Sequence, residues 1–298
     1  MSVTQNKADN SASETEGEDE KRTGLDWWKH EARELAMTIA VFLPIWVVFT
    51  SFVYELRSIP SESMVPALQV GDRVAVSKFA YGYSRYTPVL GVGQWFSSED
   101  KSKPDQRMFA SMPERGDVIV FRHPNTNRVM IKRLIGMPGD QLQVVAGVVH
   151  LNGEPIVRDF VRRVRYVKHN ERIPTNVVEF RETLPNGVSY LVYEESGKTE
   201  LDNTPVFEIP EGHVFMMGDN RDNSEDSRSP RGHIELYRQN PTGWNGLIFQ
   251  GVGSTPTAIG YVPLDHLMGR AETVAFTLYR CRKQADTECA KGRVWKGL

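Results

Sequence analysis

The chain has 298 residues, of which 40% are hydrophobic and 25% are charged, and its formal net charge is −2 at pH 7. This length accommodates one large domain or two modest ones, and the near-neutral charge argues against a nucleic-acid binder. The chain contains two cysteines and seven histidines. Cys281 and Cys289 lie close together near the end, where they either form a small disulfide in an oxidising compartment or remain free thiols. So few cysteines disfavour a zinc site.

Residues 1–24 are almost free of apolar side chains, and three basic and six acidic residues give them a net charge of −3. This composition predicts a disordered, acidic tail. Residues 25–34 are predicted to form a juxtamembrane helix, and the twenty residues from Leu35 to Tyr54 that follow carry no charge. Twenty helical residues match the hydrocarbon core of a bilayer, which is about 30 Å thick. Pro44 would damage a soluble helix but is tolerated in a membrane helix. We therefore predict a transmembrane helix over residues 35–54 rather than a buried core helix.

The charges that flank this helix predict its orientation. Lys21, Arg22, Lys29 and Arg33 precede it, whereas Arg57 alone follows it within a comparable distance. The cytoplasmic flanks of membrane helices carry an excess of Lys and Arg. The N-terminus is therefore predicted to be cytoplasmic, and residues 55–298 are predicted to form an exported domain.

From residue 56 onward, short β-favouring runs alternate with turn signals. The runs cover residues 74–76, 118–121, 129–135, 142–145, 148–151, 190–193 and 214–217. Helical periodicity is scarce, so the exported domain is predicted to be mainly β, with antiparallel sheets that are partly barrel-like. Residues 150–210 are charged and turn-rich, which indicates an insertion with strands of its own. The irregular residues 84–112 form either a loop on the membrane surface or a loop with its own aromatic core.

The strand predicted over residues 129–135 has a cation in the middle of each apolar face. Side chains alternate along a strand, so Met130, Lys132 and Leu134 point one way, and Arg133 points the other way. A lysine buried among apolar residues is desolvated, which lowers its pKa and makes the neutral amine a candidate general base. The alternative is that Lys132 extends its ammonium group to water from an ordinary edge strand. The general-base interpretation requires a nucleophile elsewhere in the chain.

A candidate nucleophile lies directly after the membrane segment. Pro60 and Pro66 prevent regular structure and hold Ser61, Glu62 and Ser63 in a fixed turn. Serines near prolines often bond only to local backbone, so this motif alone is weak. The chain contains no Gly-x-Ser-x-Gly elbow, and no histidine has the neighbours expected of a Ser-His-Asp base. A serine nucleophile would therefore need Lys132 as its base.

A third stretch, residues 218–228, alternates acids, amides, hydroxyls and arginines. This pattern predicts a hydrogen-bonded, ion-paired loop after the strand that ends at Met217. Calcium binding is the rival interpretation. It is disfavoured because Ser227 stands at the sixth position from Asp222, where an EF-hand loop needs glycine, and no glutamate closes the loop at position twelve.

Together these segments resemble bacterial type I signal peptidase, the membrane-bound leader peptidase with a Ser–Lys catalytic dyad. The resemblance extends from the membrane segment almost to the C-terminus. Its blocks are the anchor and residues 59–64, 71–82, 115–140 and 218–228, with a weaker match at 269–271. Two features depart from the family pattern: Glu62 stands where glycine is frequent, and the chain has one anchor where some relatives have two.

The resemblance implies a role for each matching residue. Ser63, directly before Met64, is the implied nucleophile, and Lys132 is the implied general base. Ser61 matches the residue whose hydroxyl joins the Ser63 backbone N–H in the oxyanion hole. Ser224 matches a serine that forms a hydrogen bond with the lysine and orients it. The residues implied to hold the site together are Asp219, Asp226 and Arg228.

The implied activity is removal of signal peptides from secretory preproteins after small-x-small sequences, at the bacterial inner membrane and without a metal or organic cofactor. The implied partners are preproteins and the lipid bilayer, with no nucleic acid, and the implied state is a monomer. One alternative is a specialised peptidase of the same family that serves conjugation or pilus export. Another is a membrane-anchored β module that binds cell-envelope components without catalysis. Self-cleaving Ser–Lys repressors are disfavoured because this chain starts with a membrane span and shows no DNA-binding domain.

Overall fold

The structure is a computed structural model that describes residues 24–88, 105–126, 128–168, 174–195, 200–228, 259–278 and 293–298. The predicted tail up to residue 23, the pair Cys281 and Cys289, and residues 229–258 lie outside the described residues. The chain divides into two compact units, residues 1–46 and 47–298, and each is described by itself.

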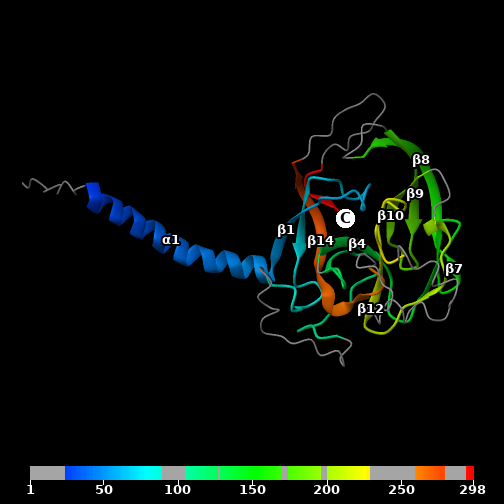
Figure 1. Cartoon of the computed structure of the whole chain (residues 1–298), viewed down its shortest axis with the longest axis horizontal. Helices are drawn as coiled ribbons and strands as arrows, with labels where there is room; N and C mark the ends of the chain where they lie inside the picture. Colours follow the sequence, from blue (N-terminus) through cyan, green and yellow to red (C-terminus); the bar gives the residue numbers. More distant parts are fainter. Residues whose placement is uncertain are drawn as a thin grey trace, which may run out of the picture. The chain divides into compact units, whose positions relative to one another are not determined.

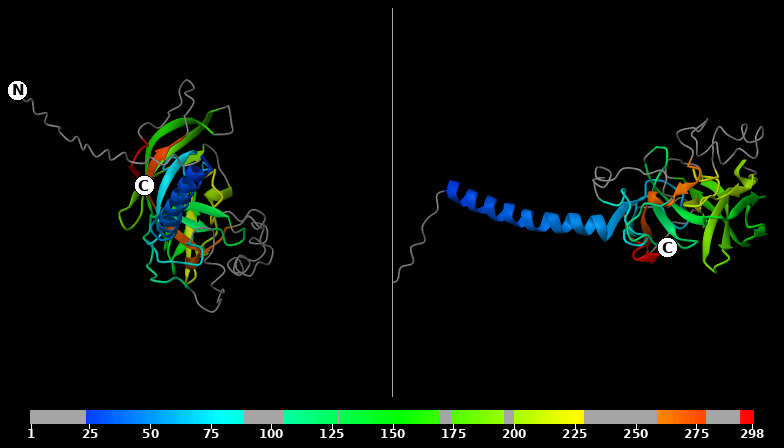
Figure 2. Two further views of the ribbon diagram at one scale, coloured as in Figure 1. Left: turned by 90° about the vertical axis from the view of Figure 1, so that its left-hand side faces the viewer. Right: turned by 90° about the horizontal axis from the view of Figure 1, so that it is seen from below.

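The N-terminal helix α1 covers Gly24–Phe52 and continues through Pro44 (Figure 2). The segments predicted separately as residues 25–34 and 35–54 are therefore one helix, because no helix-breaking residue lies between them. The helix ends before the predicted boundary, since Tyr54 already belongs to a strand. The part from Trp27 to Phe52 has a hydropathy of 2.1, and among the described residues it is the one helix long and apolar enough to cross a membrane.

Residues from Tyr54 onward form β structure, which confirms the predicted fold class of a mainly β domain with one N-terminal apolar helix (Figure 1). The main sheet has the order β1-β2-β14-β3-β4-β12-β13, and β15 is added to β14. Its pairs are antiparallel. The strands are β1 (Tyr54–Ser58), β2 (Asp72–Ser77), β3 (Val118–Arg122), β4 (Val129–Gly136), β12 (His213–Met217), β13 (Val262–Pro263), β14 (Leu267–Thr277) and β15 (Lys296–Gly297).

The main sheet is curled because β14 carries bulges. Its register shifts twice against β2, between Ala271 and Thr273 and between Val274 and Phe276, and once against β3. Each bulge bends a strand and increases its twist. The sheet curls without joining β1 to β13, which agrees with the expectation of a partly barrel-like sheet.

Two smaller sheets account for most of the chain between β4 and β12. One has the order β11-β5-β6-β7, with β5 (Gln141–Val145), β6 (Val148–Leu151), β7 (Glu154–Pro155) and β11 (Phe207–Glu208). The other has the order β10-β9-β8, with β8 (Val157–Val167), β9 (Pro174–Thr183) and β10 (Ser189–Glu195). Short 3-10 helices cover Glu200–Asp202 and Leu264–His266. Residues 150–210 therefore carry strands of their own, as expected.

Local sequence explains the turns and the faces of these strands. Asn152 and Gly153 join β6 to β7 with φ values of 54° and 89°, the left-handed conformation that a tight hairpin turn requires. On β4, Met130 and Leu134 pack in one apolar cluster, whereas Ile131 belongs to a second cluster. This separation matches the alternation expected of a strand.

The segment 84–112 is described only in part. Tyr86 is buried in an apolar cluster, whereas Phe109 is 83% exposed. The segment thus contributes an aromatic residue to the core and also presents apolar side chains at the surface.

Candidate active site

Ser63 lies in the connection between β1 and β2, and this connection is fixed by backbone hydrogen bonds. Ile59 N donates to Asp72 O at 3.0 Å, and Gly71 N donates back to Ile59 O at 2.9 Å, so the two ends of the loop are held together. Within the loop, Val65 N donates to Glu62 O at 3.1 Å. Met64 is fully buried and anchors the loop in the core. The Ser63 side chain is consequently buried and held in one place.

Lys132 occupies the middle of β4, where it pairs with Ile119 of β3. Its side chain is 2% exposed, and its Nζ is hydrogen-bonded to Ser63 Oγ. The two residues are 69 positions apart in the chain. The structure therefore brings together the serine and the lysine that were predicted to act as nucleophile and base.

The pKa of Lys132 is lowered to about 8, mainly because burial disfavours its charged form. The carboxylates of Asp226 and Asp219 oppose this effect by favouring the ammonium form. Desolvation is the stronger influence, so a substantial fraction of Lys132 is a neutral amine near pH 8. The desolvation that the apolar strand pattern predicted is present.

Asp226 and Arg228 close the loop that follows β12. Asp226 accepts hydrogen bonds from Gly218 N at 3.0 Å and from Arg228 Nε at 3.0 Å. Arg228 Nη2 also donates to the Arg221 carbonyl at 2.6 Å. Burial alone would raise the pKa of Asp226, but Arg228, the Gly218 N–H and Lys132 hold it below its ordinary value. Asp226 therefore remains a carboxylate that organises the loop.

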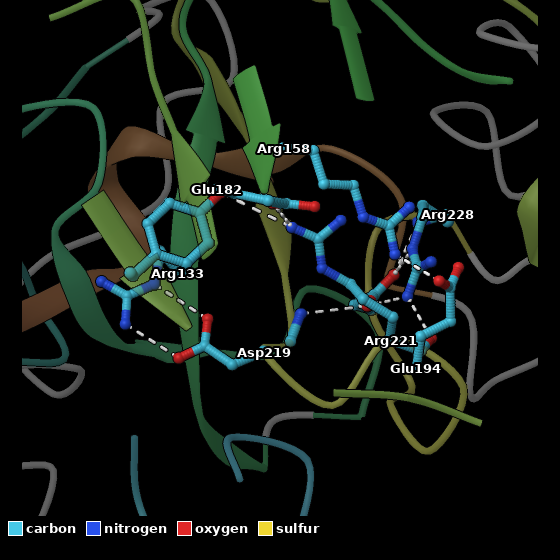
Figure 3. Close-up of polar contacts among 10 residues, drawn as sticks. Arg133, Arg158, Glu182, Glu194, Asp219, Arg221 and Arg228 are labelled. Atoms are coloured by element: carbon cyan, nitrogen blue, oxygen red, sulfur yellow. Dashed lines mark hydrogen bonds and ion pairs between the residues drawn. The ribbon is translucent and has the colours of Figure 1, made fainter. Parts of the chain in front are cut away.

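Asp219 pairs with the other cation of β4. Arg133 donates to the Asp219 carboxylate through Nε and Nη2, both at 2.8 Å (Figure 3). The guanidinium carbon of Arg133 also lies 4.3 Å from the centre of the Tyr190 ring. This two-point ion pair ties the loop to the strand that carries Lys132.

Gly218 lies where the loop passes closest to the serine. A Cβ at this position would lie 2.1 Å from Ser224 Oγ and 2.5 Å from the Ser63 carbonyl oxygen. Any side chain here would displace one of the two serines. The glycine therefore permits the loop to pack against the Ser63 backbone.

The two remaining serines differ in their contacts. Ser61 Oγ lies 3.4 Å from Ser63 Oγ, next to the candidate nucleophile. Ser224 Oγ is buried and has no hydrogen-bond partner among the described residues. The expected hydrogen bond from Ser224 to Lys132 is therefore absent here, although Ser224 lies beside Gly218 at the edge of the site.

The family model described as signal peptidase, peptidase S26, matches residues 32–276. The chain belongs to this family. Signal peptidase I of Rickettsia bellii (strain OSU 85-389) is 37% identical over 227 residues, which cover 74% of this chain and 71% of that one. Signal peptidase I of Rickettsia typhi is 31% identical over 256 residues, covering 84% and 80%. A solved signal peptidase I from Enterococcus faecalis V583 is 21% identical, with a TM-score of 0.28 over 54% of this chain and 97% of that chain. The protein is thus a peptidase with an N-terminal apolar helix.

Sequence reasoning missed several residues that shape the site of this signal peptidase family member. Arg133 was noticed as a cation, but nothing in a single sequence indicated Asp219 as its partner. Asn220 and Gly218 lie within the predicted loop, but the sequence pattern does not distinguish them from the other residues of the loop. No group of three or more His, Cys, Asp or Glu side chains that could hold a metal ion occurs among the residues that the structure describes.

Proposed function

We propose that this peptidase removes signal peptides from secretory preproteins, with Ser63 as the nucleophile and Lys132 as the general base. The observation that carries the proposal is the hydrogen bond between the buried Lys132 Nζ and Ser63 Oγ. It is supported by the pKa of Lys132, which burial lowers to about 8. A buried amine with this pKa is well suited to accept a proton near neutral pH.

In the first half of the reaction, neutral Lys132 takes the Ser63 hydroxyl proton while Oγ attacks the scissile carbonyl carbon. The tetrahedral intermediate collapses when the lysine ammonium gives this proton to the leaving amine, which frees the mature protein. In the second half, neutral Lys132 takes a proton from water, and the hydroxide attacks the ester. Ser63 leaves with the proton returned by the lysine.

The oxyanion that forms in each half needs hydrogen-bond donors. The proposed donors are the Ser63 backbone N–H and the Ser61 hydroxyl, whose oxygen lies 3.4 Å from Ser63 Oγ. The Ser63 N–H makes no hydrogen bond to another described residue, so it is available to the substrate oxygen. Removing one such donor costs about 3–4 kcal/mol of transition-state stabilisation in well-studied hydrolases.

The substrate is proposed to bind as an added strand beside β4. On one side, β4 pairs with β3 from Val129 to Arg133. On the other side, β12 pairs only with residues from Arg133 to Gly136, which leaves the edge of Val129–Lys132 without a partner strand among the described residues. An extended peptide on this edge would gain backbone hydrogen bonds, while shallow pockets would select small residues before the scissile bond.

The helix α1 is proposed to anchor the enzyme in the bacterial inner membrane, with the N-terminus in the cytoplasm and the catalytic domain outside. The positive charges before the helix support this orientation. Anchoring would keep the catalytic domain near the membrane from which a signal peptide emerges. The bilayer and the preproteins are the proposed partners.

Cleavage of a purified preprotein with an Ala-x-Ala site tests the dyad. We expect Ser63→Ala and Lys132→Ala to lower kcat by about 10³-fold or more, because neither partner works without the other. Ser58→Ala is the matched control, since Ser58 is exposed at the end of β1 and should leave the rate unchanged. Substantial activity in either dyad variant would refute the assignment.

A further inference from the structure

We propose that Asn220 is a positioning residue that aims the Ser63 backbone N–H at the oxyanion, and that Tyr166 holds the Asn220 amide in place. This inference rests on the proposed function, because it assumes that the Ser63 N–H is an oxyanion donor. It assigns a role to the sheet β10-β9-β8, since Tyr166 belongs to β8.

Asn220 contacts both peptide groups that flank the Ser63 Cα. Its backbone N–H donates to the Ser63 carbonyl at 3.1 Å. Its side-chain Nδ2 donates to the Glu62 carbonyl at 3.2 Å. One residue of the loop after β12 thus fixes the backbone on each side of the candidate nucleophile.

The Glu62 carbonyl and the Ser63 N–H belong to the same peptide group. In a trans peptide, C=O and N–H lie in one plane and point in opposite directions. A hydrogen bond that holds the Glu62 oxygen therefore also fixes the direction of the Ser63 N–H. The turn hydrogen bond from Val65 N reaches the same oxygen at 3.1 Å, so Asn220 supplies a second donor to it.

Chemistry fixes the orientation of the Asn220 amide. The Glu62 carbonyl can only accept a hydrogen bond, so the NH₂ end of the amide must face it. The second N–H donates to the Tyr166 hydroxyl at 3.0 Å. Both donors are thereby used, one on the catalytic loop and one on β8.

The amide oxygen of Asn220, Oδ1, indicates that this side chain does more than fill space in the core. Asn220 is fully buried, and its Oδ1 has no hydrogen-bond partner among the described residues. A buried polar atom without a partner destabilises the fold. An apolar residue would avoid this cost, so the two donated hydrogen bonds are the physical reason for an asparagine here.

The sheet β10-β9-β8 supports Asn220 from the other side. Asn220 forms a parallel bridge with Tyr193 of β10, in which Arg221 N donates to Tyr193 O at 2.8 Å. Tyr166 and Tyr193 pack with Val65 in one apolar cluster, so they also contact the loop that carries Ser63. The sheet therefore holds the loop after β12 and the Ser63 loop in a fixed relation.

The test measures cleavage of an Ala-x-Ala substrate by the full chain in phospholipid vesicles, well below the unfolding temperature of each variant. Asn220→Asp keeps the shape of the side chain but cannot donate to the Glu62 carbonyl as a carboxylate. We expect Asn220→Asp and Asn220→Ala to lower kcat by about 10-fold or more, with KM within about twofold, because the donor matters in the transition state. Tyr166→Phe should lower kcat by a smaller factor, since the amide keeps its bond to Glu62.

A peptide aldehyde ending in alanine distinguishes aiming of the N–H from general support of the fold. Ser63 adds to the aldehyde to give a hemiacetal, whose oxygen occupies the oxyanion position. The Asn220 variants should bind the aldehyde more weakly by the same factor as the fall in kcat, while their affinity for an uncleavable peptide stays unchanged. Combining Asn220→Ala with Ser61→Ala should lower kcat by less than the product of the single effects, since both act on one oxyanion.

Asn223→Ala is the matched control, because Asn223 lies in the same loop and its side-chain amide donates to the Glu62 carboxylate, at 3.5 Å, instead of the Glu62 carbonyl. The backbone hydrogen bond from Asn223 N to Asn220 O, at 3.1 Å, does not depend on the side chain that this variant removes. It should retain wild-type kcat. Unchanged kcat in the Asn220 variants, a loss confined to KM, or unchanged aldehyde affinity would each overturn the inference. If Ser63→Ala loses activity while the Asn220 variants give one of these results, the dyad proposal stands and the proposed role of Asn220 is refuted.

Discussion

At the scale of single residues, the buried amine of Lys132 sets the pH dependence of the proposed reaction. The base must be neutral, and its pKa is lowered to about 8. Protonation therefore removes activity as the pH falls below about 8, and kcat/KM should decrease about tenfold per pH unit on that side. A pH–rate profile on a soluble peptide measures this limb. A midpoint near the free-lysine value of about 10.4 would contradict a desolvated base.

The charge of a neighbouring carboxylate provides a check that this limb of the pH–rate profile reports the protonation of Lys132. The half-exposed Glu225 favours the ammonium form of Lys132 and so raises its pKa. Glu225→Gln should therefore move the limb to lower pH while the plateau stays the same. A shift to higher pH would show that the limb does not report Lys132.

Gly218 is the second residue with a sharp expectation. In Gly218→Ala the new Cβ would lie 2.1 Å from Ser224 Oγ and 2.5 Å from the Ser63 carbonyl, so the site must shift. Overpacking of this kind typically costs about 1–3 kcal/mol of stability, and we expect a fall of about 10-fold or more in kcat/KM. Gly297→Ala is the control, because a Cβ there meets nothing within 4 Å. Equal kcat/KM of Gly218→Ala and Gly297→Ala would show that the packing around Gly218 accommodates a Cβ without moving the site.

The role of a single residue could be predicted from the sequence where its neighbours in the chain determine its environment. Lys132 could be predicted because an apolar strand around a lysine has a direct electrostatic consequence. The partner of Arg133 could not, because Asp219, Asp226 and several other acids were equally available in the sequence. The role of Asn220 depends on a carbonyl 158 residues away, and local pattern carries no information about such a contact.

At the scale of elements, Arg293, which lies three residues before the short strand β15, reaches back to the Ser63 loop. Arg293 is buried and donates to the Asp72 carboxylate through Nε at 3.1 Å and to the Ala67 carbonyl through Nη2 at 2.8 Å. Asp72 in turn accepts from Gln69 N at 2.8 Å. Arg293 thus holds the loop between β1 and β2, which carries the candidate nucleophile.

Breaking this pair should be costly because Asp72 would remain buried without its cation. We expect Arg293→Met to lower the free energy of unfolding by about 3–5 kcal/mol, measured by urea denaturation. The double variant with Asp72→Asn should recover part of that loss. Arg128→Ala, which affects a mostly exposed pair, is the control and should change stability by about 1 kcal/mol or less. A small effect of Arg293→Met would show that the pair is not stabilising.

The positions of the strands in the sequence were largely predictable, but the order in which they pair in the sheets was not. Alternating apolar residues and Gly-containing turns identify individual strands, because side-chain period and turn geometry are local properties. The position of β14 between β2 and β3 is a long-range property, since it joins segments about 150 to 200 residues apart. The sheet β10-β9-β8 lies in the segment that was predicted as an insertion with strands of its own. Its contact with Asn220 could not be predicted, because this contact exists only in the folded chain.

At the scale of the whole molecule, the division after Trp46 lies within α1 and separates most of this apolar helix from the unit that contains the folded β structure. Val53, directly after α1, belongs with the β unit, because Lys78 N donates to Val53 O at 2.9 Å and β1 pairs with β2 along its length. A soluble form should therefore begin near residue 53. Removal of β1 would leave β2 as an unprotected edge.

A form that begins at residue 53 should separate chemistry from anchoring. All of the residues proposed for the reaction lie in the β unit, so kcat/KM on a short soluble peptide should stay within about threefold of the full chain in detergent. On a preprotein embedded in vesicles, we expect the rate to fall by about 100-fold or more, because the anchor raises the effective concentration of enzyme at the membrane. Parallel assays of the two forms on both substrates measure the difference. Equal losses on both would show that α1 supports the fold of the catalytic unit, and no loss on either would show that anchoring does not assist the reaction.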